Sequence, residues 1–143
     1  MRSVSVAQAE SFCAWAGGRL PSSGEWLLAA AGKEGRRFPW GNTGLVCRRA
    51  VFGLGDGPCA GDGTAPDPPG SRPDGATPEG VFDLAGNVAE WTRDPDGRVR
   101  AHGGSYLTSS AAELKSWAAA EGSEPAPDVG FRCVYPADAA APR

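Results

Sequence analysis

The sequence predicts a single folded, loop-rich domain built from short helices and short strands. Its 143 residues are the length of one ordinary domain. The 21 Gly and 13 Pro, about a quarter of the chain, do not repeat and are spread among five Trp, five Phe and two Tyr. This composition is typical of a domain rich in turns. It argues against a helical bundle, a coiled coil and a doubly wound α/β sheet.

Two short helices are predicted near the N-terminus, at residues 5–17 and 22–31. Each range begins with a serine that is followed three residues later by Gln or Glu, the pattern of a capping box: Ser5 with Gln8, and Ser22 with Glu25. In the first range apolar side chains recur at helical spacing, and Gly17 follows as a helix stop. Because only a tight link separates the two ranges, the helices are expected to pack on one another.

A long segment without periodicity follows, from Gly35 to Gly80, and it is dense in turn signals. A loop of this length inside a compact domain is normally functional or stapled. Further elements are expected beyond it: a turn at 94–97, short strands at 98–101, 105–107 and 129–135, a short helix or turn at 111–120, and a flexible tail at 137–143.

Charge and apolar patterning limit the expected partners. The net charge is −3 and no basic stripe is present, so nucleic acid is not expected as a partner. No apolar run approaches the roughly 20 residues that a membrane span needs. Residues 1–8 lack the apolar region of a signal peptide, so no export signal is expected in the chain as given.

The four cysteines, Cys13, Cys47, Cys59 and Cys133, allow three pairings. None forms a C-x-x-C pair and the chain has one His, so the spacing fits a structural zinc site poorly. Two disulfides and four buried thiols both fit better, and the cellular compartment would decide between them.

Four segments in a fixed order carry a family resemblance. They are residues 12–21 (FCAWAGGRLP) with 25–26 (EW), residues 38–41 (FPWG), residues 80–91 (GVFDLAGNVAEW), and residues 103–106 (GGSY) with 130–133 (GFRC). Together they closely resemble the formylglycine-generating enzyme family, also called sulfatase-modifying factors. The resemblance implies an α+β fold of C-type-lectin-like type with long loops. Because family members usually carry an N-terminal segment with several strands, residues 1–136 are expected to be a partial domain that lacks this segment or receives it from another chain or domain.

The resemblance also implies how the cysteines pair. Cys13 and Cys133 match a family bridge between the first helix and the last strand, which leaves Cys47 to pair with Cys59. Four reduced, buried cysteines remain the alternative. Disulfides are expected if the protein is exported, and thiols if it is cytosolic, so the location would be extracytoplasmic if the bridges form.

A calcium site is the best-supported site that the resemblance implies. Its ligands would be the side chains of Asp83 and Glu90 and the carbonyl oxygens of Gly86 and Val88. Such oxygen donors on an irregular turn suit Ca²⁺, which takes six to eight oxygen ligands. In the alternative reading, Asp83 and Asn87 cap turns and Glu90 pairs with an arginine.

The catalytic residues of the family do not carry over. Catalytic members hold copper(I) with two cysteines shortly after the Gly-Gly-Ser segment, and the matching positions here are Thr108 and Glu113. Copper is therefore not expected, and an arginine that the family often carries corresponds to Ala120. A related branch that makes sulfoxides uses iron held by histidines, but His102 stands alone and is expected to be an ordinary strand residue.

The resemblance also implies a ligand groove, for which the candidate residues are Tyr106, Thr108, Glu113 and Trp117. Aromatic and small hydroxyl side chains are typical of binding surfaces, although Trp117 alternatively closes the core. Two hypotheses follow. The first is a non-catalytic, calcium-stabilised binding or scaffold module for a peptide, protein or glycan. The second is a divergent formylglycine-generating oxidase that uses copper to oxidise a sulfatase cysteine.

Overall fold

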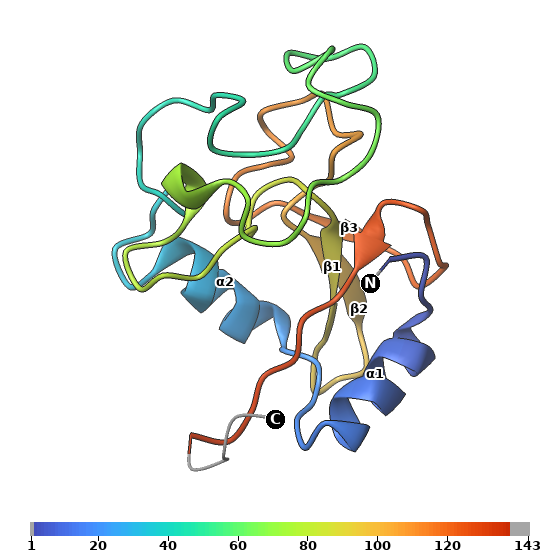
Figure 1. Ribbon diagram of the computed structural model, residues 1–143. Coiled ribbons are helices and arrows are strands. Elements are labelled where there is room, and N and C mark those ends of the chain that lie inside the picture. Colours follow the sequence, from blue (N-terminus) through green and yellow to red (C-terminus); the bar gives the residue numbers. More distant parts are fainter. Residues whose placement is uncertain (1, 138–143) are drawn as a thin grey trace.

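The computed structural model describes residues 2–137 and shows a small α+β domain (Figure 1). The predicted tail at 137–143 lies outside the described residues apart from Ala137. Two helices and a small sheet form one half of the molecule, and long loops from the middle of the chain form the other.

The helices are α1, Val6–Trp15, and α2, Ser23–Ala31, and both begin with the predicted capping boxes. In α1 the backbone N–H of Gln8 donates to the Ser5 hydroxyl at 3.2 Å, and the Gln8 side chain accepts from the Ser5 N–H at 2.9 Å. Such a cap satisfies backbone donors that the first helical turn leaves unpaired. The helix α1 ends two residues earlier than predicted, because the chain turns with a positive φ of 82° at Gly17.

The strands form one mixed sheet in the order β3-β2-β1-β4. They are β1, Ala89–Arg93; β2, Val99–His102; β3, Ala119–Glu121; and β4, Val129–Gly130. The pairs β1–β2 and β2–β3 are antiparallel, and β1–β4 is parallel. The predicted turn at 94–97 joins β1 to β2, since the N–H of Gly97 donates to the carbonyl of Asp94 at 2.9 Å.

The two helices do not pack on one another, so that expectation was wrong. Side chains alternate across a strand, and this separates the helices onto opposite faces of β1 (Figure 1). Trp91 packs with α1 residues in one buried cluster. On the other face Trp26 of α2 donates its indole N–H to Glu90 at 2.8 Å, while Ser23 and Thr92 share a hydrogen bond of 3.1 Å.

Three predicted elements differ from the structure. Residues 105–107 form a turn rather than a strand, because the N–H of Tyr106 donates to Asn87 of a different loop and the N–H of Thr108 donates back to Ser105. The Ala-rich segment 111–120 is a series of turns whose end enters β3. The last strand covers only 129–130 of the predicted 129–135.

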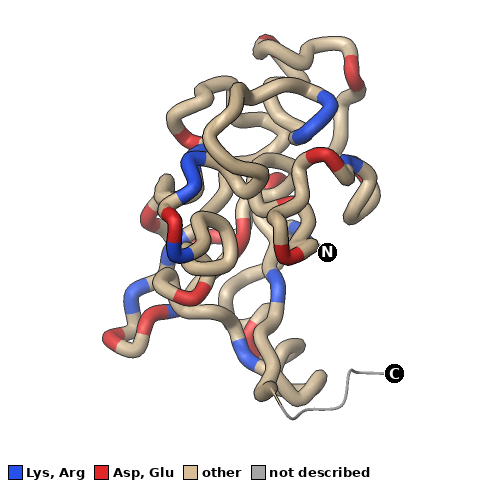
Figure 2. Tube along the Cα trace, turned by 90° about the vertical axis from the view of Figure 1, so that its left-hand side faces the viewer, with Lys and Arg blue, Asp and Glu red and all other residues tan. Residues whose placement is uncertain are grey.

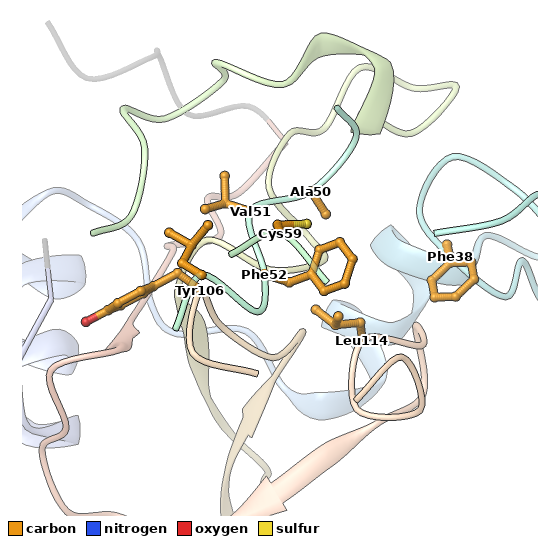
Figure 3. Packing of buried hydrophobic residues seen from close by; sticks show 8 residues of the cluster. Phe38, Ala50, Val51, Phe52, Cys59, Tyr106 and Leu114 are labelled. Atoms are coloured by element: carbon orange, nitrogen blue, oxygen red, sulfur yellow. The ribbon is translucent and has the colours of Figure 1, made fainter. Parts of the chain in front are cut away.

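The long middle segment is stapled and has a core of its own (Figure 3). The predicted disulfide joins Cys47 to Cys59 with a Cα–Cα distance of 5.7 Å. A buried cluster lies beside it: Phe38, Ala50, Val51, Phe52, Leu54, Cys59, Tyr106 and Leu114. These apolar contacts explain how the segment folds with only one short 3-10 helix, Pro73–Gly75.

The second predicted disulfide, Cys13–Cys133, ties α1 to the C-terminal segment with a Cα–Cα distance of 5.5 Å. Positive and negative side chains are interspersed along the chain (Figure 2). Within residues 2–137, no helix has the length and apolar character needed to cross a membrane.

Candidate functional site

An irregular turn between the loop segment and β1 carries the predicted calcium ligands. Three of its residues have positive φ: Asp83 at 58°, Gly86 at 75° and Asn87 at 64°. The N–H of Gly86 donates to Gly103 and that of Asn87 to Val51, so the turn is held from both sides. A Cβ at Gly86 would lie 2.4 Å from the Val51 carbonyl oxygen, and only glycine fits there.

The two carboxylates of this turn have different partners. Asp83 accepts a hydrogen bond from the Gly70 N–H at 2.7 Å. Burial raises the pKa of the Asp83 carboxyl above its usual value, and the charges of Glu90 and Asp67 add to this rise. Glu90 is 5% exposed and accepts hydrogen bonds from Trp26 and from both Nε and Nη2 of Arg132. The alternative reading is thus right that Glu90 pairs with an arginine.

Some of the oxygen atoms around the turn are free to bind a hard cation, and others are already paired. Asp83, Val88, Glu90 and Arg132 border one open cavity of about 720 Å³. Among the described residues the carbonyl oxygens of Gly86 and Val88 accept no hydrogen bond, and the buried Oδ1 of Asn87 has no partner. Free oxygen donors beside a carboxylate are what Ca²⁺ binds, but the ion pair with Arg132 occupies both oxygens of Glu90.

A second pocket lies where the sheet meets the turn that follows Gly104. Thr108 and Glu113 line it, together with Ser105 and Asp128, and its volume is about 320 Å³. Ser105 is 1% exposed and donates its hydroxyl to Asp128 Oδ2 at 2.6 Å, and its own N–H donates to Thr108 Oγ1 at 2.9 Å. Ser105 thus connects two other lining residues of the pocket, Thr108 and Asp128.

Two of the four predicted groove residues lie elsewhere. Tyr106 is 6% exposed and packs in the loop core, so it cannot line a groove (Figure 3). Trp117 is 53% exposed, which also excludes the alternative in which it closes the core. The Lys115 ammonium lies 5.8 Å from the centre of the Trp117 ring. The structure therefore brings together only Thr108 and Glu113.

Among the residues that the structure describes, no cysteine sulfur and no imidazole lines this pocket. All four cysteines are in disulfides. Cys47, Cys59 and Asp62 are the one group of three metal-ligand side chains among residues 2–137, and both sulfurs are in the bridge. His102 is buried and stacks on Trp26 with ring centres 4.9 Å apart, and burial lowers its pKa.

The model of the sulfatase-modifying factor enzyme 1-like domain matches residues 1–137 of this chain. The chain belongs to this family. It is 35% identical over 148 residues to the inactive C-alpha-formylglycine-generating enzyme 2 of Bos taurus, an alignment that covers 92% of this chain and 48% of the relative. It is 34% identical over 168 residues to the formylglycine-generating enzyme of Streptomyces coelicolor, covering 94% and 52%.

A third family relative is the hercynine oxygenase of Mycolicibacterium smegmatis, which is 38% identical over 96 residues, 64% of this chain and 21% of that protein. This chain thus spans about a fifth to a half of the length of these relatives. Among solved structures, PvdO from Pseudomonas aeruginosa has a TM-score of 0.70 at 20% identity, covering 91% of this chain and 59% of that one. This likeness shows the fold alone.

Sequence reasoning missed three residues of these sites. Asp128 and Ser105 shape the second pocket, and Arg132 holds Glu90. Ser105 and Arg132 belong to the family segments GGSY and GFRC, so a signal for them was present. Asp128 lies directly before β4 in a stretch without a motif, and only the fold brings it to Ser105.

Proposed function

We propose that this chain is a non-catalytic member of its family, a binding module that offers the pocket of Thr108 and Glu113 to a peptide, protein or glycan. The observation that carries the proposal is the donor set. The pocket is lined by two hydroxyl and two carboxylate side chains, whereas copper(I) requires soft thiolates, and every sulfur of the chain's cysteines is in a disulfide. The similarity to a relative named as inactive adds support.

The competing proposal is a divergent copper-dependent oxidase, which the similarity to formylglycine-generating enzymes favours. An oxidation assay separates the two. The disulfide-intact chain is incubated with copper, oxygen and a Cys-x-Pro-x-Arg peptide, and formylglycine is measured by mass spectrometry. The binding-module proposal expects no product above the peptide-alone control, and copper-dependent turnover would overturn it.

The proposal includes stabilisation by Ca²⁺ at the turn of Asp83, Gly86 and Val88. Glu90 is a further ligand through Oε1, which accepts one hydrogen bond, whereas Oε2 accepts two. The unpaired carbonyl oxygens and the half-buried Asp83 carboxylate support it. Calcium that binds the folded state and not the unfolded chain would stabilise the folded state by mass action. The C-type-lectin-like description of the fold is part of the same proposal, supported by the long stapled loops beside a small sheet.

Calcium-dependent melting tests this part. The proposal expects calcium to raise the melting temperature of the wild-type chain over chelator-treated protein, and expects the rise to disappear in Asp83→Ala. The matched control Asp56→Ala alters an exposed carboxylate elsewhere and should keep the full rise. An identical melting temperature with calcium and with chelator would remove calcium from the proposal.

A further inference from the structure

The walls of the pocket of Thr108 and Glu113 come mostly from small residues, five of them alanines. All four strands contribute residues to the pocket, and Ala118 and Asp128 each lie directly before a strand. The other lining residues come from the turns between β2 and β3. The lining residues are Ala89, Ala101, Gly104, Ser105, Thr108, Glu113, Ala118, Ala119, Ala120, Asp128 and Val129. We call this the alanine-walled pocket. Its volume of about 320 Å³ is at the lower end for ligand sites, so it suits a small group on a short alkyl stem.

The charge of this lining is entirely negative. Glu113 and Asp128 border the pocket, and no Lys, Arg or His does. Among residues 2–137 no cationic side chain lies within ion-pair distance of either carboxylate. Elsewhere in the domain, the largely buried Asp94 carboxylate does have such a partner, since it pairs with Arg100 at 2.7 Å.

The hydrogen bonds of the pocket hold one of these charges in place. The buried Ser105 hydroxyl donates to Asp128 Oδ2 at 2.6 Å, and the backbone carbonyl of Asp128 accepts from the Ala89 N–H at 2.9 Å. Asp128 is therefore fixed at the wall, with Oδ1 outside these bonds. A positioned anion beside apolar walls attracts a cation more strongly than a mobile anion in water does.

We propose that the alanine-walled pocket binds a small organic cation, an alkylammonium group whose stem lies against the wall of alanine residues and whose charge lies between Glu113 and Asp128. This inference rests on the proposed function, because it assigns a ligand chemistry to the same pocket. The inference predicts that the pocket selects ligands by their charge and not by their apolar area alone.

Three probes of similar size test the charge selection: butylammonium, 1-butanol and butyrate. Binding to the ¹⁵N-labelled full chain is followed by the shifts of the Gly104, Ala119 and Ala120 amides in NMR titrations. We expect butylammonium to bind about tenfold more tightly than 1-butanol, and butyrate not to bind. Equal binding of butylammonium and 1-butanol, preferred binding of butyrate, or no binding by any probe would overturn the inference.

Variants that replace each carboxylate by the neutral amide test whether Glu113 and Asp128 bind the ammonium group. Glu113→Gln alters an exposed side chain and leaves the fold intact, so it should weaken butylammonium about tenfold and leave 1-butanol unchanged. Asp128→Asn should act in the same direction, and Glu124→Gln, an exposed carboxylate outside the lining, is the matched control. Equal butylammonium affinity in Glu113→Gln and the control would contradict the proposal.

The cation has two sources, a lysine side chain of a protein partner or a free amine. A blocked lysine, Nα-acetyl-lysine methylamide, distinguishes them. Binding at least as tight as that of butylammonium supports a peptide lysine, and exclusion of the blocked lysine with retained butylammonium supports a free amine. The proposed function and this inference can be overturned separately. Product formation in the oxidation assay would overturn the proposed function, whereas loss of charge selection in the titrations would overturn this inference alone.

Discussion

Arg132 and Glu90 form an ion pair beneath the turn of residues 83–88, with Nε and Oε2 separated by 2.5 Å. The Glu90 side chain is 7% exposed and that of Arg132 26%. Trp26 donates to the same carboxylate, and Arg132 Nη2 also donates to the Phe82 carbonyl at 2.9 Å. The pair thus connects α2, β1, the C-terminal segment and Phe82, the residue directly before the turn.

Replacing Arg132 by Met should lower the free energy of unfolding by about 3 kcal/mol, because Glu90 would remain as a buried charge with one donor. Urea unfolding measures the loss. The control is Arg98→Met, whose partner Asp96 is exposed, and it should change stability little. Equal effects of the two substitutions would show that the Glu90–Arg132 pair does not secure the turn.

The two disulfides should contribute different amounts to the free energy of unfolding. Removing Cys13–Cys133 with paired Cys→Ala substitutions is expected to cost about 5 kcal/mol, and removing Cys47–Cys59 about 3 kcal/mol, since the bridged residues are 120 and 12 positions apart. Chemical denaturation of the two double variants under the same conditions checks the order. A larger loss from the Cys47–Cys59 pair would mean that loop-closure entropy does not set these contributions.

Glu25 should make stability depend on pH in the acid range. The Arg19 guanidinium, followed by the Ser22 N–H, lowers the pKa of the Glu25 carboxyl to about 2. A lowered pKa in the folded state gives stability that is present above the ordinary value of 4.5 and is lost as the pH falls toward 2. Because the pair is exposed, the loss should be at most about 1 kcal/mol.

Unfolding of Glu25→Gln and wild type at a series of pH values tests this dependence. The difference between the two chains should be largest near neutral pH and should shrink through the range from 4.5 to about 2. A constant difference across that range would contradict the assignment of the lowered pKa to Glu25.

Gly86→Ala should be strongly destabilising. The new Cβ would lie 2.4 Å from the Val51 carbonyl oxygen, and φ is 75°, so steric overlap adds to backbone strain at a total of about 3 kcal/mol. Gly97→Ala is the matched control, with a φ of 87° but no atom within 4 Å of the new Cβ. It should cost only about 1 kcal/mol in thermal unfolding. Equal losses would mean that the approach to Val51 does not constrain the turn.

Local signals predicted the parts of this fold that local interactions determine. The capping boxes at Ser5 and Ser22 act within one helical turn, so their sequence pattern is sufficient. The wrong assignment of residues 105–107 has the opposite cause, since the Tyr106 N–H bonds to Asn87, a residue of a distant loop. The short link between the helices predicts that α1 and α2 pack on one another. Instead, side chains along β1 point alternately to its two faces, and each face contacts a different helix.

At the candidate sites too, sequence signals predict some residues, whereas contacts between distant parts of the chain determine others. The family resemblance predicts Thr108, Glu113 and Glu90 as site residues, but it also predicts Tyr106 in a groove, and the loop core buries Tyr106. Asp128 was missed because its role depends on a hydrogen bond to Ser105 across the fold. Neither distance along the chain nor residue type reveals such a contact.

No cysteine sulfur among the described residues lines the pocket of Thr108 and Glu113, and our central proposal is that this pocket does not bind copper(I). Anaerobic titration of the disulfide-intact chain with copper(I), against a chromophoric competitor, tests it most directly. The double variant Thr108→Cys/Glu113→Cys serves as the positive control. We expect tight binding of one copper by the double variant and no competition by the wild-type chain. Stoichiometric, tight copper binding by the wild-type chain would contradict the account.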